Sequence, residues 1–371
     1  MLPGKTLTGD TFYLNLGPQH PSTHGVLRLL LRLDGEWIVE ADPIIGYSHR
    51  AHEHMAQNRT YAQFFPNTSR MDYLAALMYN HAYCLAVEKA CGIAPPPRAE
   101  YIRMICAELN RISSHLLWFG TFLLDLGGIT PFLYSFDDRE DILDILGEVT
   151  GSRLTYSYCR FGGVRDDIND RFIERIRAFI PKLRSRFKDY DTLVTKNVIF
   201  VNRTRNVGVI SKEMAGQYAV TGPCLRASGI PYDIRRMEPY SLYPEVDFEI
   251  PVGEKGDCYD RYQVRMAEME QSLRIIEQAT DRIPEGPCLA SGIPLYIRPP
   301  EGEYHFSYES PRGHLGIYFV SDGSRIPYRM KWRTPSFSNL SIIPAILPDT
   351  LVADTIAILG SIDVVIPEID R

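Results

Sequence analysis

Alternating apolar and polar residues predict an antiparallel hairpin near the start of the chain. The leucines at positions 27, 29, 31 and 33 alternate with Arg28 and Arg32, the period-two pattern of a half-buried strand. Asp34-Gly35 then supplies a turn before a second strand over residues 36–45. The loop that leads into this hairpin, residues 17–25, contains glycines and prolines that restrict its backbone.

Helical periodicity follows. Apolar residues recur at three- and four-residue spacing over residues 71–90, and Gly92 with the prolines at 95–97 ends that helix. The same spacing predicts helices over residues 99–126, 136–150 and 261–282. A further helix over residues 170–191 should be interrupted or kinked at Pro181.

The remaining segments indicate strands and irregular structure. Residues 197–256 are rich in Gly, Pro and Tyr and are expected to be irregular or short-stranded. Residues 315–320 and 326–333 flank Ser321-Asp322-Gly323-Ser324, a second hairpin. This order predicts an α+β fold, in which β-structure from the N- and C-terminal segments flanks a central helix bundle.

A chain of 371 residues can form two domains or one large one. We divide it into a β-rich segment with a histidine loop (1–60), a helical core (61–195), an irregular excursion (196–260), and a long helix followed by C-terminal β-structure (261–371). We expect these segments to form one cooperative unit.

Composition excludes several classes of protein. Hydrophobic residues make up 45% and charged residues 23%, which is ordinary for a globular protein. A net charge of −6 offers no overall attraction to nucleic acid or to an anionic membrane. The apolar stretch at 116–126 contains Asp125 and is shorter than the ~20 residues that span a bilayer. With no signal peptide expected, any membrane association should be peripheral or through partners.

Cysteine spacing and motif searches remove most self-contained enzymes. The seven cysteines form no CxxC pair, which favours buried thiols in a reducing compartment and argues against a zinc or iron–sulfur site in this chain. The sequence has no GxGxxG, GxxxxGK[ST], GxSxG or HExxH motif. A self-bound nicotinamide, phosphoryl transfer and serine hydrolysis therefore lack their usual signals.

Three histidines, His49, His52 and His54, lie within six residues and could in principle bind a metal. On a helix, however, positions 52 and 54 point in different directions. We therefore favour a solvated or interface helix start over a metal site.

Four other residues are stronger candidates for chemistry. His20 and His24 lie in the restricted loop, where they either serve a ligand or hydrogen-bond the loop backbone. Tyr73 is either a functional phenol or a core aromatic with a satisfied hydroxyl. Asp125, in an apolar helix, needs a partner, and His24 or His115 could supply it. A buried Asp–His pair with a tyrosine would suit reduction of a two-carbonyl ring, because each oxygen must gain a proton.

At these residues the sequence resembles the quinone-site subunit of respiratory complex I, which is the D subunit of NADH-quinone oxidoreductase. The most specific motif is Gly17-Pro18-Gln19-His20-Pro21-Ser22-Thr23-His24-Gly25. The matching stretches follow in order at residues 14–28, 58–61, 70–74, 86–89, 114–116, 123–127, 130–132, 161–164, 225–229, 320–323 and 370–371.

The resemblance implies that His24 and Tyr73 hydrogen-bond the two oxygens of a quinone head group and that Asp125 pairs with His24. It places Arg70 beside an iron–sulfur cluster carried by a small partner subunit, so this chain binds no cofactor or metal of its own. The implied role is that of a core subunit of a proton-pumping NADH:quinone oxidoreductase, together with other hydrophilic-arm subunits and membrane-arm subunits. The implied location is peripheral, on the cytoplasmic side of a prokaryotic inner membrane.

The implied fold is that of the nickel–iron hydrogenase large subunit, but hydrogen activation needs two cysteine pairs that are missing here. Two departures from the family stand out. Residues 154–158 contain no histidine where many members carry one, with Thr155 at that place, which would suit a low-potential quinone such as menaquinone. The segment 284–311 is short, which leaves ferredoxin or reduced F420 open as electron donor besides NADH.

An alternative from another class is a scaffold subunit that kept the fold and lost the chemistry. The joint presence of His24, Tyr73 and Asp125 argues against it.

Overall fold

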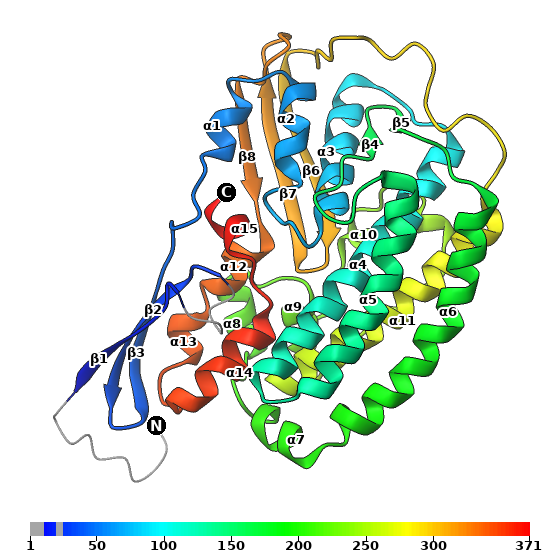
Figure 1. Cartoon of the computed structure of the whole chain (residues 1–371). Helices are drawn as coiled ribbons and strands as arrows, with labels where there is room; N and C mark the ends of the chain where they lie inside the picture. The colour runs from blue at the N-terminus through cyan, green and yellow to red at the C-terminus, as the bar shows by residue number, and fades with distance from the viewer. Residues whose placement is uncertain (1–10, 20–24) are drawn as a thin grey trace.

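The computed structural model describes residues 11–19 and 25–371. The long helices form a bundle on the right of Figure 1, and two three-stranded antiparallel sheets, from the N- and C-terminal parts of the chain, lie to its left. The α+β fold predicted from the sequence is confirmed.

The N-terminal sheet has the order β1-β2-β3, with strands Phe12–Leu16, Arg28–Asp34 and Trp37–Ile44. The alternating leucines are buried as predicted, and Gly35 occupies the turn with φ 62°. Their apolar face packs against helices near the C-terminus, in one hydrophobic cluster with Ile343, Ile358 and Ile362. The two ends of the sequence therefore share a core.

The helix bundle contains α3 (Ala76–Cys91), α4 (Pro97–Asp125), α5 (Ile129–Thr150), α6 (Asp170–Tyr190) and α11 (Cys258–Arg282). All five predicted long helices exist. α6 runs through Pro181 without a break and continues into a π-helical turn, η2 (Asp191–Thr195), so an interruption is wrong, whereas a kink at Pro181 stays a prediction. One proline removes one helical hydrogen bond, and the amphipathic packing of α6 against α5 and α11 outweighs that loss.

Short elements fill the connections. Helices α1 (His52–Ala56) and α2 (Tyr61–Thr68) precede the bundle, and the strands β4 (Cys159–Arg160) and β5 (Gly163–Val164) form a small ribbon. Residues 197–256, all of them described, contain no strand. They contain the helices α7 (Val198–Thr204), α8 (Lys212–Gln217), α9 (Pro223–Ala227) and α10 (Ile234–Met237) and the 3₁₀ turn η3 (Tyr243–Glu245).

The short strands expected in that segment are therefore a wrong prediction. Side chains of Asn197, Ser211 and Asp233 cap the backbone N–H groups at the starts of α7, α8 and α10. Capping residues of this kind stabilise even short helices.

The C-terminal sheet has the order β6-β7-β8, with strands Gly302–Ser310, Gly313–Ser321 and Arg329–Arg333. The hairpin of β7 and β8 is confirmed, whereas β6 was not predicted. The end of the chain is helical rather than β-structure: α12 (Pro335–Leu340), α13 (Ile343–Ile346), α14 (Val352–Ile362) and α15 (Ile366–Asp370). These helices are short and mostly buried, so their sequence lacks the polar face that identifies a surface helix.

Contacts cross the predicted segment boundaries. Trp37 of β3 forms a bridge with Leu351, and backbone N–H groups of Gly46 and Ser48 donate to the Asp370 carboxylate at 2.8 and 2.7 Å. The division into four segments and their cooperative unfolding stay predictions. Within residues 11–19 and 25–371, no helix is both long and apolar enough to cross a membrane.

Candidate functional site

Tyr73 and Arg70 lie in the turn between α2 and α3. Tyr73 is 37% exposed, so it is not a core aromatic, and its hydroxyl has no hydrogen-bond partner among the described residues. Arg70 is exposed, and its guanidinium donates to the carbonyl oxygen of Pro66 (2.8 Å) and to the hydroxyl of Ser69 (2.7 Å). Both candidate side chains are therefore presented at the surface of this chain.

The turn that carries Tyr73 is held from two sides. One oxygen of the Asp72 carboxylate accepts hydrogen bonds from the backbone N–H groups of Leu74 (3.0 Å) and Ala75 (3.1 Å). Asn110 on α4 donates to the carbonyl oxygen of Leu74 (2.9 Å) and accepts from the N–H of Leu77 (3.2 Å). These bonds satisfy polar backbone groups before α3 begins, which explains why the helix starts at residue 76 and not at 71.

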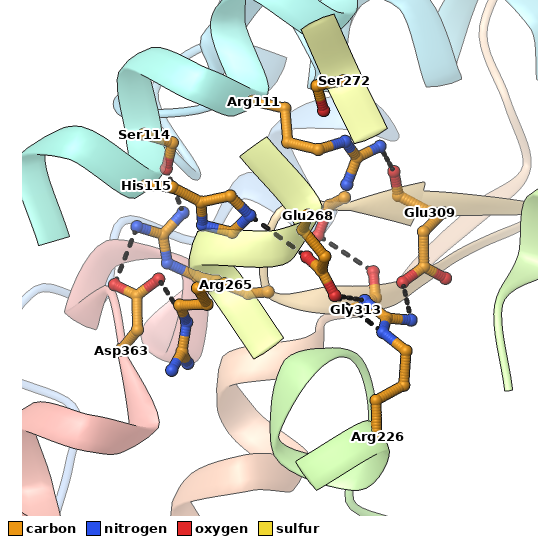
Figure 2. Close-up of polar contacts among 12 residues, drawn as sticks. Arg111, Ser114, His115, Arg226, Arg265, Glu268, Ser272, Glu309, Gly313 and Asp363 are labelled. Atoms are coloured by element: carbon orange, nitrogen blue, oxygen red, sulfur yellow. Dashed lines mark hydrogen bonds and ion pairs between the residues drawn. The ribbon is translucent and has the colours of Figure 1, made fainter. Parts of the chain in front are cut away.

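Behind the turn lies Arg312, which is fully buried. Its guanidinium donates to Asp72 (2.7 Å), to the hydroxyl of Ser114 on α4 (3.2 Å) and to Asp363 at the end of α14 (3.1 Å). Ser114 and Asp363, which accept two of these bonds, lie near each other in Figure 2. Segments more than 200 residues apart in sequence thus meet directly behind Tyr73.

Arg312 is placed by a close crossing of two backbones. A Cβ atom on Gly222 (φ 66°) would lie 2.4 Å from the carbonyl oxygen of Arg312, and one on Gly313 (φ 126°) would lie 2.4 Å from the hydroxyl of Thr221. Only glycine fits at either position. The loop between β6 and β7 is therefore fixed in position by the start of α9.

A second group of buried charges lies deeper in the bundle (Figure 2). His115 Nε2 lies 3.2 Å from Glu268 of α11, Arg226 of α9 donates to Glu268 at 2.7 Å, and Arg226 also donates to Glu309 of β6 at 2.8 Å. Burial alone would raise the pKa of Glu268, but Arg226 and His115 lower it to about 2. Burial lowers the pKa of His115, so its imidazole is neutral at neutral pH.

This arrangement corrects one expectation. His115 is occupied by Glu268 and cannot be the partner of Asp125, because ten residues of the same helix separate them by about 15 Å. Asp125 is the last residue of α4 and is half-buried, less buried than expected. Asp125 is not without a partner within the described part of the chain.

His20 and His24 lie outside the described residues. The pairing of His24 with Asp125 and the contacts of His24 and Tyr73 with a quinone therefore stay predictions.

The end of the bundle around Asp125 is apolar. Large side chains exposed there include Leu124, Ile129, Leu133, Val198 and Ile199. Next to it, residues of α7 and η2 line a hollow of about 140 Å³ together with Leu123, Leu126, Gly127, Gly128 and Pro131. The end of the bundle therefore presents an apolar surface beside Asp125.

The histidine group at residues 49–54 differs from expectation in one member. The helix does start at His52, but that side chain is buried and not solvated, and burial, with Arg50 and His49, lowers its pKa to about 4. His49 Nδ1 contacts the carbonyl oxygen of Asp370 (2.6 Å), and His54 is exposed. In the part of the chain that the structure describes, no three His, Cys, Asp or Glu side chains are grouped to hold a metal.

Sequence reasoning did not single out Asp72, Arg312 or Asp363. The signal for Asp72 was its place beside Tyr73, and the signal for Arg312 was a charged residue in the turn Ser310-Pro311-Arg312-Gly313 that follows a buried strand. Neither signal reveals that the two side chains meet.

Comparison with known proteins adds an independent finding. Residues 125–295 and 292–371 match the family described as respiratory-chain NADH dehydrogenase, 49 Kd subunit. The chain is 63% identical over 365 residues to the D subunit of NADH-quinone oxidoreductase from Syntrophobacter fumaroxidans, covering 98% of both chains. It is 56% identical over 362 residues to the protein of that name from Desulfotalea psychrophila (98% of this chain, 97% of the relative) and 52% identical over 365 residues to that from Desulforamulus reducens (98% and 100%).

Proposed function

Because the chain belongs to the 49 kDa subunit family of respiratory-chain NADH dehydrogenase, we propose that it forms the quinone-reduction site of a complex I-like oxidoreductase. Its relatives are named as D subunits of NADH-quinone oxidoreductase. The observation that carries the proposal is Tyr73, whose side chain is 37% exposed, whose hydroxyl has no partner in the described part of the chain, and whose turn is fixed by Asp72 and Asn110.

The chemistry requires a proton for each quinone oxygen as two electrons arrive. Burial raises the pKa of the Tyr73 hydroxyl, so it is a phenol at neutral pH and can donate to one oxygen. His24 donates to the other oxygen, with Asp125 behind its imidazole. Asp125 lies eleven residues beyond Ser114 on α4, about 16 Å along the helix axis from the residue that Arg312 contacts behind Tyr73.

Electrons reach the quinone from an iron–sulfur cluster held by a small partner subunit. In this proposal Arg70 faces that cluster. Its side chain is exposed, and only Nη1 of its guanidinium donates to the carbonyl oxygen of Pro66, so other donor groups are left for the partner. Other hydrophilic-arm subunits deliver the electrons from NADH. A ferredoxin- or F420-dependent complex would use this subunit in the same way.

Reduction leaves an unpaired charge at Asp125, and that electrostatic change drives proton translocation in membrane-arm subunits. The apolar end of the bundle supports this placement, because Ile129 and Leu133 are exposed beside Asp125 and suit contact with an apolar membrane subunit. The chain would then sit peripherally, on the cytoplasmic side of the membrane.

The test is Tyr73→Phe in the assembled complex. Loss of one proton donor should lower quinone reduction about 10²-fold, while reduction of the partner's cluster by the electron donor survives. Tyr296→Phe is the matched control, because Tyr296 is another exposed tyrosine and stacks on Arg325 (3.7 Å from the guanidinium carbon to the ring centroid). Equal loss of both steps in Tyr73→Phe would indicate an assembly role and contradict the proposal.

Asp125→Asn tests the coupling step. We expect a larger loss of proton translocation or turnover than of complex abundance, because asparagine keeps the size of the side chain and removes only its charge. Unchanged translocation per electron at normal turnover would refute the role of Asp125.

A further inference from the structure

We propose that Arg312 is a positioning residue for quinone reduction: by clamping Asp72 and Asp363 together behind Tyr73, it fixes the phenol and supplies the cation against which that phenol releases its proton. This inference rests on the proposed function. It concerns side chains that do not touch the quinone themselves.

Arg312 contacts both carboxylates, but Asp72 is held more completely than Asp363. Asp72 is fully satisfied, since one oxygen holds the Tyr73 turn and the other accepts from Arg312. Asp363 is held less completely: Oδ1 accepts from Arg312 at 3.1 Å, whereas Oδ2 is buried without a hydrogen bond. Arg265 Nε, also without a hydrogen bond, lies 4.0 Å from that oxygen.

The backbone at the end of α14 fixes where the Asp363 side chain starts. Asp363 ends α14 in the left-handed conformation (φ 59°, ψ 62°), which only a few residue types other than glycine adopt readily. An unsatisfied buried carboxylate oxygen is costly. Asp363 therefore lies between two guanidinium groups, with Arg312 at hydrogen-bond distance and Arg265 at 4.0 Å.

The same contacts determine which charges surround Arg312. Arg312 brings one positive charge against the two carboxylates of Asp72 and Asp363. The other titratable groups around it are Glu368 of α15, Tyr79 of α3, His115 of α4 and Arg265 of α11.

These charges act on Tyr73 in opposite senses. Burial raises the pKa of the Tyr73 hydroxyl, Arg312 lowers it, and Asp72 and Asp363 raise it. Removing the positive charge of Arg312 should therefore raise the pKa of the phenol, and removing the negative charge of Asp72 or Asp363 should lower it.

The step itself balances. The quinone oxygen, reduced by electrons from the partner's cluster, takes the proton as the O–H bond of Tyr73 breaks and a new O–H bond forms on the quinone. A phenolate remains, and Arg312 is the buried cation that stabilises it. Because Tyr73 is 37% exposed, water can return the proton.

The experiment is a pH profile of quinone turnover in the assembled complex, normalised to complex abundance. Activity should fall at high pH as Tyr73 loses its proton, and Tyr73→Phe should lack this alkaline limb. Arg312→Gln should lower turnover at least tenfold and move the limb to higher pH. Asp363→Asn should move the limb to lower pH, and Arg312→Lys should restore most of the turnover with the limb near its original place.

Arg103→Gln is the matched control. Arg103 is a fully buried arginine paired with Glu88 at 2.7 Å, and it lies eleven residues from Ser114, about 16 Å along α4. This substitution should lower the amount of complex without moving the limb.

The outcomes separate the two proposals. Unchanged turnover in Tyr73→Phe would sink both. Loss of turnover in Tyr73→Phe, with Arg312→Gln and Asp363→Asn moving the limb in the same direction or not at all, would overturn the role of Arg312 alone. If Arg312→Gln does not assemble, Arg312→Lys and Asp363→Asn still decide the matter.

Discussion

Glu108 offers a sharp test of how the interior is stabilised. Its carboxylate is fully buried on α4 and accepts hydrogen bonds from Arg111 (3.0 Å), Arg235 (3.3 Å), Tyr243 (2.6 Å) and Ser272 (2.7 Å). Replacement by glutamine keeps the size and one acceptor oxygen, but it removes the carboxylate partner of the buried Arg111 and leaves the buried Arg235 with Asp233 alone. We predict that Glu108→Gln strongly destabilises the chain at neutral pH.

The magnitude follows from the charge balance. Burial would raise the pKa of Glu108, but Arg111 and Arg235 lower it from the ordinary 4.5 to about 2. At about 1.4 kcal/mol per pKa unit, this difference corresponds to roughly 3 kcal/mol of folding free energy. Removal of one partner of a buried ion pair costs about 3 to 5 kcal/mol in other proteins, which agrees.

The pH dependence has a definite sign. The folded-state pKa of Glu108 lies below the unfolded value, so its stabilisation is fully present above about pH 4.5 and is lost as the pH falls towards 2. The difference in unfolding free energy between wild type and Glu108→Gln should therefore shrink over that range.

Urea unfolding of the full-length chain at pH 7, 5 and 3 measures this difference. Asp281→Asn is the control, because Asp281 pairs with Arg177 at 3.0 Å on the surface, where the loss should be within about 1 kcal/mol. A Glu108→Gln protein within that same margin at pH 7, or a difference that does not change with pH, would refute the reasoning.

Three further predictions concern stability. Burial and Asp72 raise the pKa of Glu368 to about 7, so between pH 4.5 and 7 the folded chain binds more protons at this site than the unfolded chain. The free energy of unfolding should therefore fall by up to roughly 3 kcal/mol as the pH rises over that range. In Glu368→Gln this fall, measured by urea unfolding, should be reduced. Gly313→Ala should lower the midpoint of thermal unfolding sharply, because its Cβ would meet Thr221 and Gly222. Gly216→Ala, in open space on α8, should be neutral or stabilising. Similar midpoints for the two variants would contradict the close approach of the two backbones at Gly313. Thr60→Ala removes the capping box of α2 and should cost about 1 kcal/mol by chemical unfolding, and no measurable loss would contradict that contribution.

Elements with a clear period could be predicted from the sequence. The five long helices and the two hairpins were found, because each has one buried face or a turn with a fixed residue requirement. The end of the chain was missed for the opposite reason. Residues 355–362 are mostly buried, since α4 and α11 both pack against α14, and a helix covered from several sides gives no clear period to read.

The candidate site divides in the same way. Tyr73 and Arg70 could be chosen from the sequence because both lie in one short motif, residues 70–74. Residues so close along the chain lie near each other in any fold. The clamp behind them could not be predicted. Arg312 and Asp72 are 240 residues apart, and an arginine in a turn is usually solvated. Only the crossing of two glycine-containing backbones brings that arginine inside.

Buried arginines connect distant parts of this chain. Arg103 joins α4 to α3 and β5, Arg226 joins α9 to α11 and β6, and Arg265 joins α11 to the end of α14. Buried ion pairs add little net stability compared with apolar packing, yet each is costly to break, so they penalise any arrangement in which the partners do not meet. The Tyr73 turn depends on such a pair with the loop after β6 and, through it, on α14. A change in the last helices should therefore reach the phenol through Arg312, although no residue of those helices needs to touch the quinone.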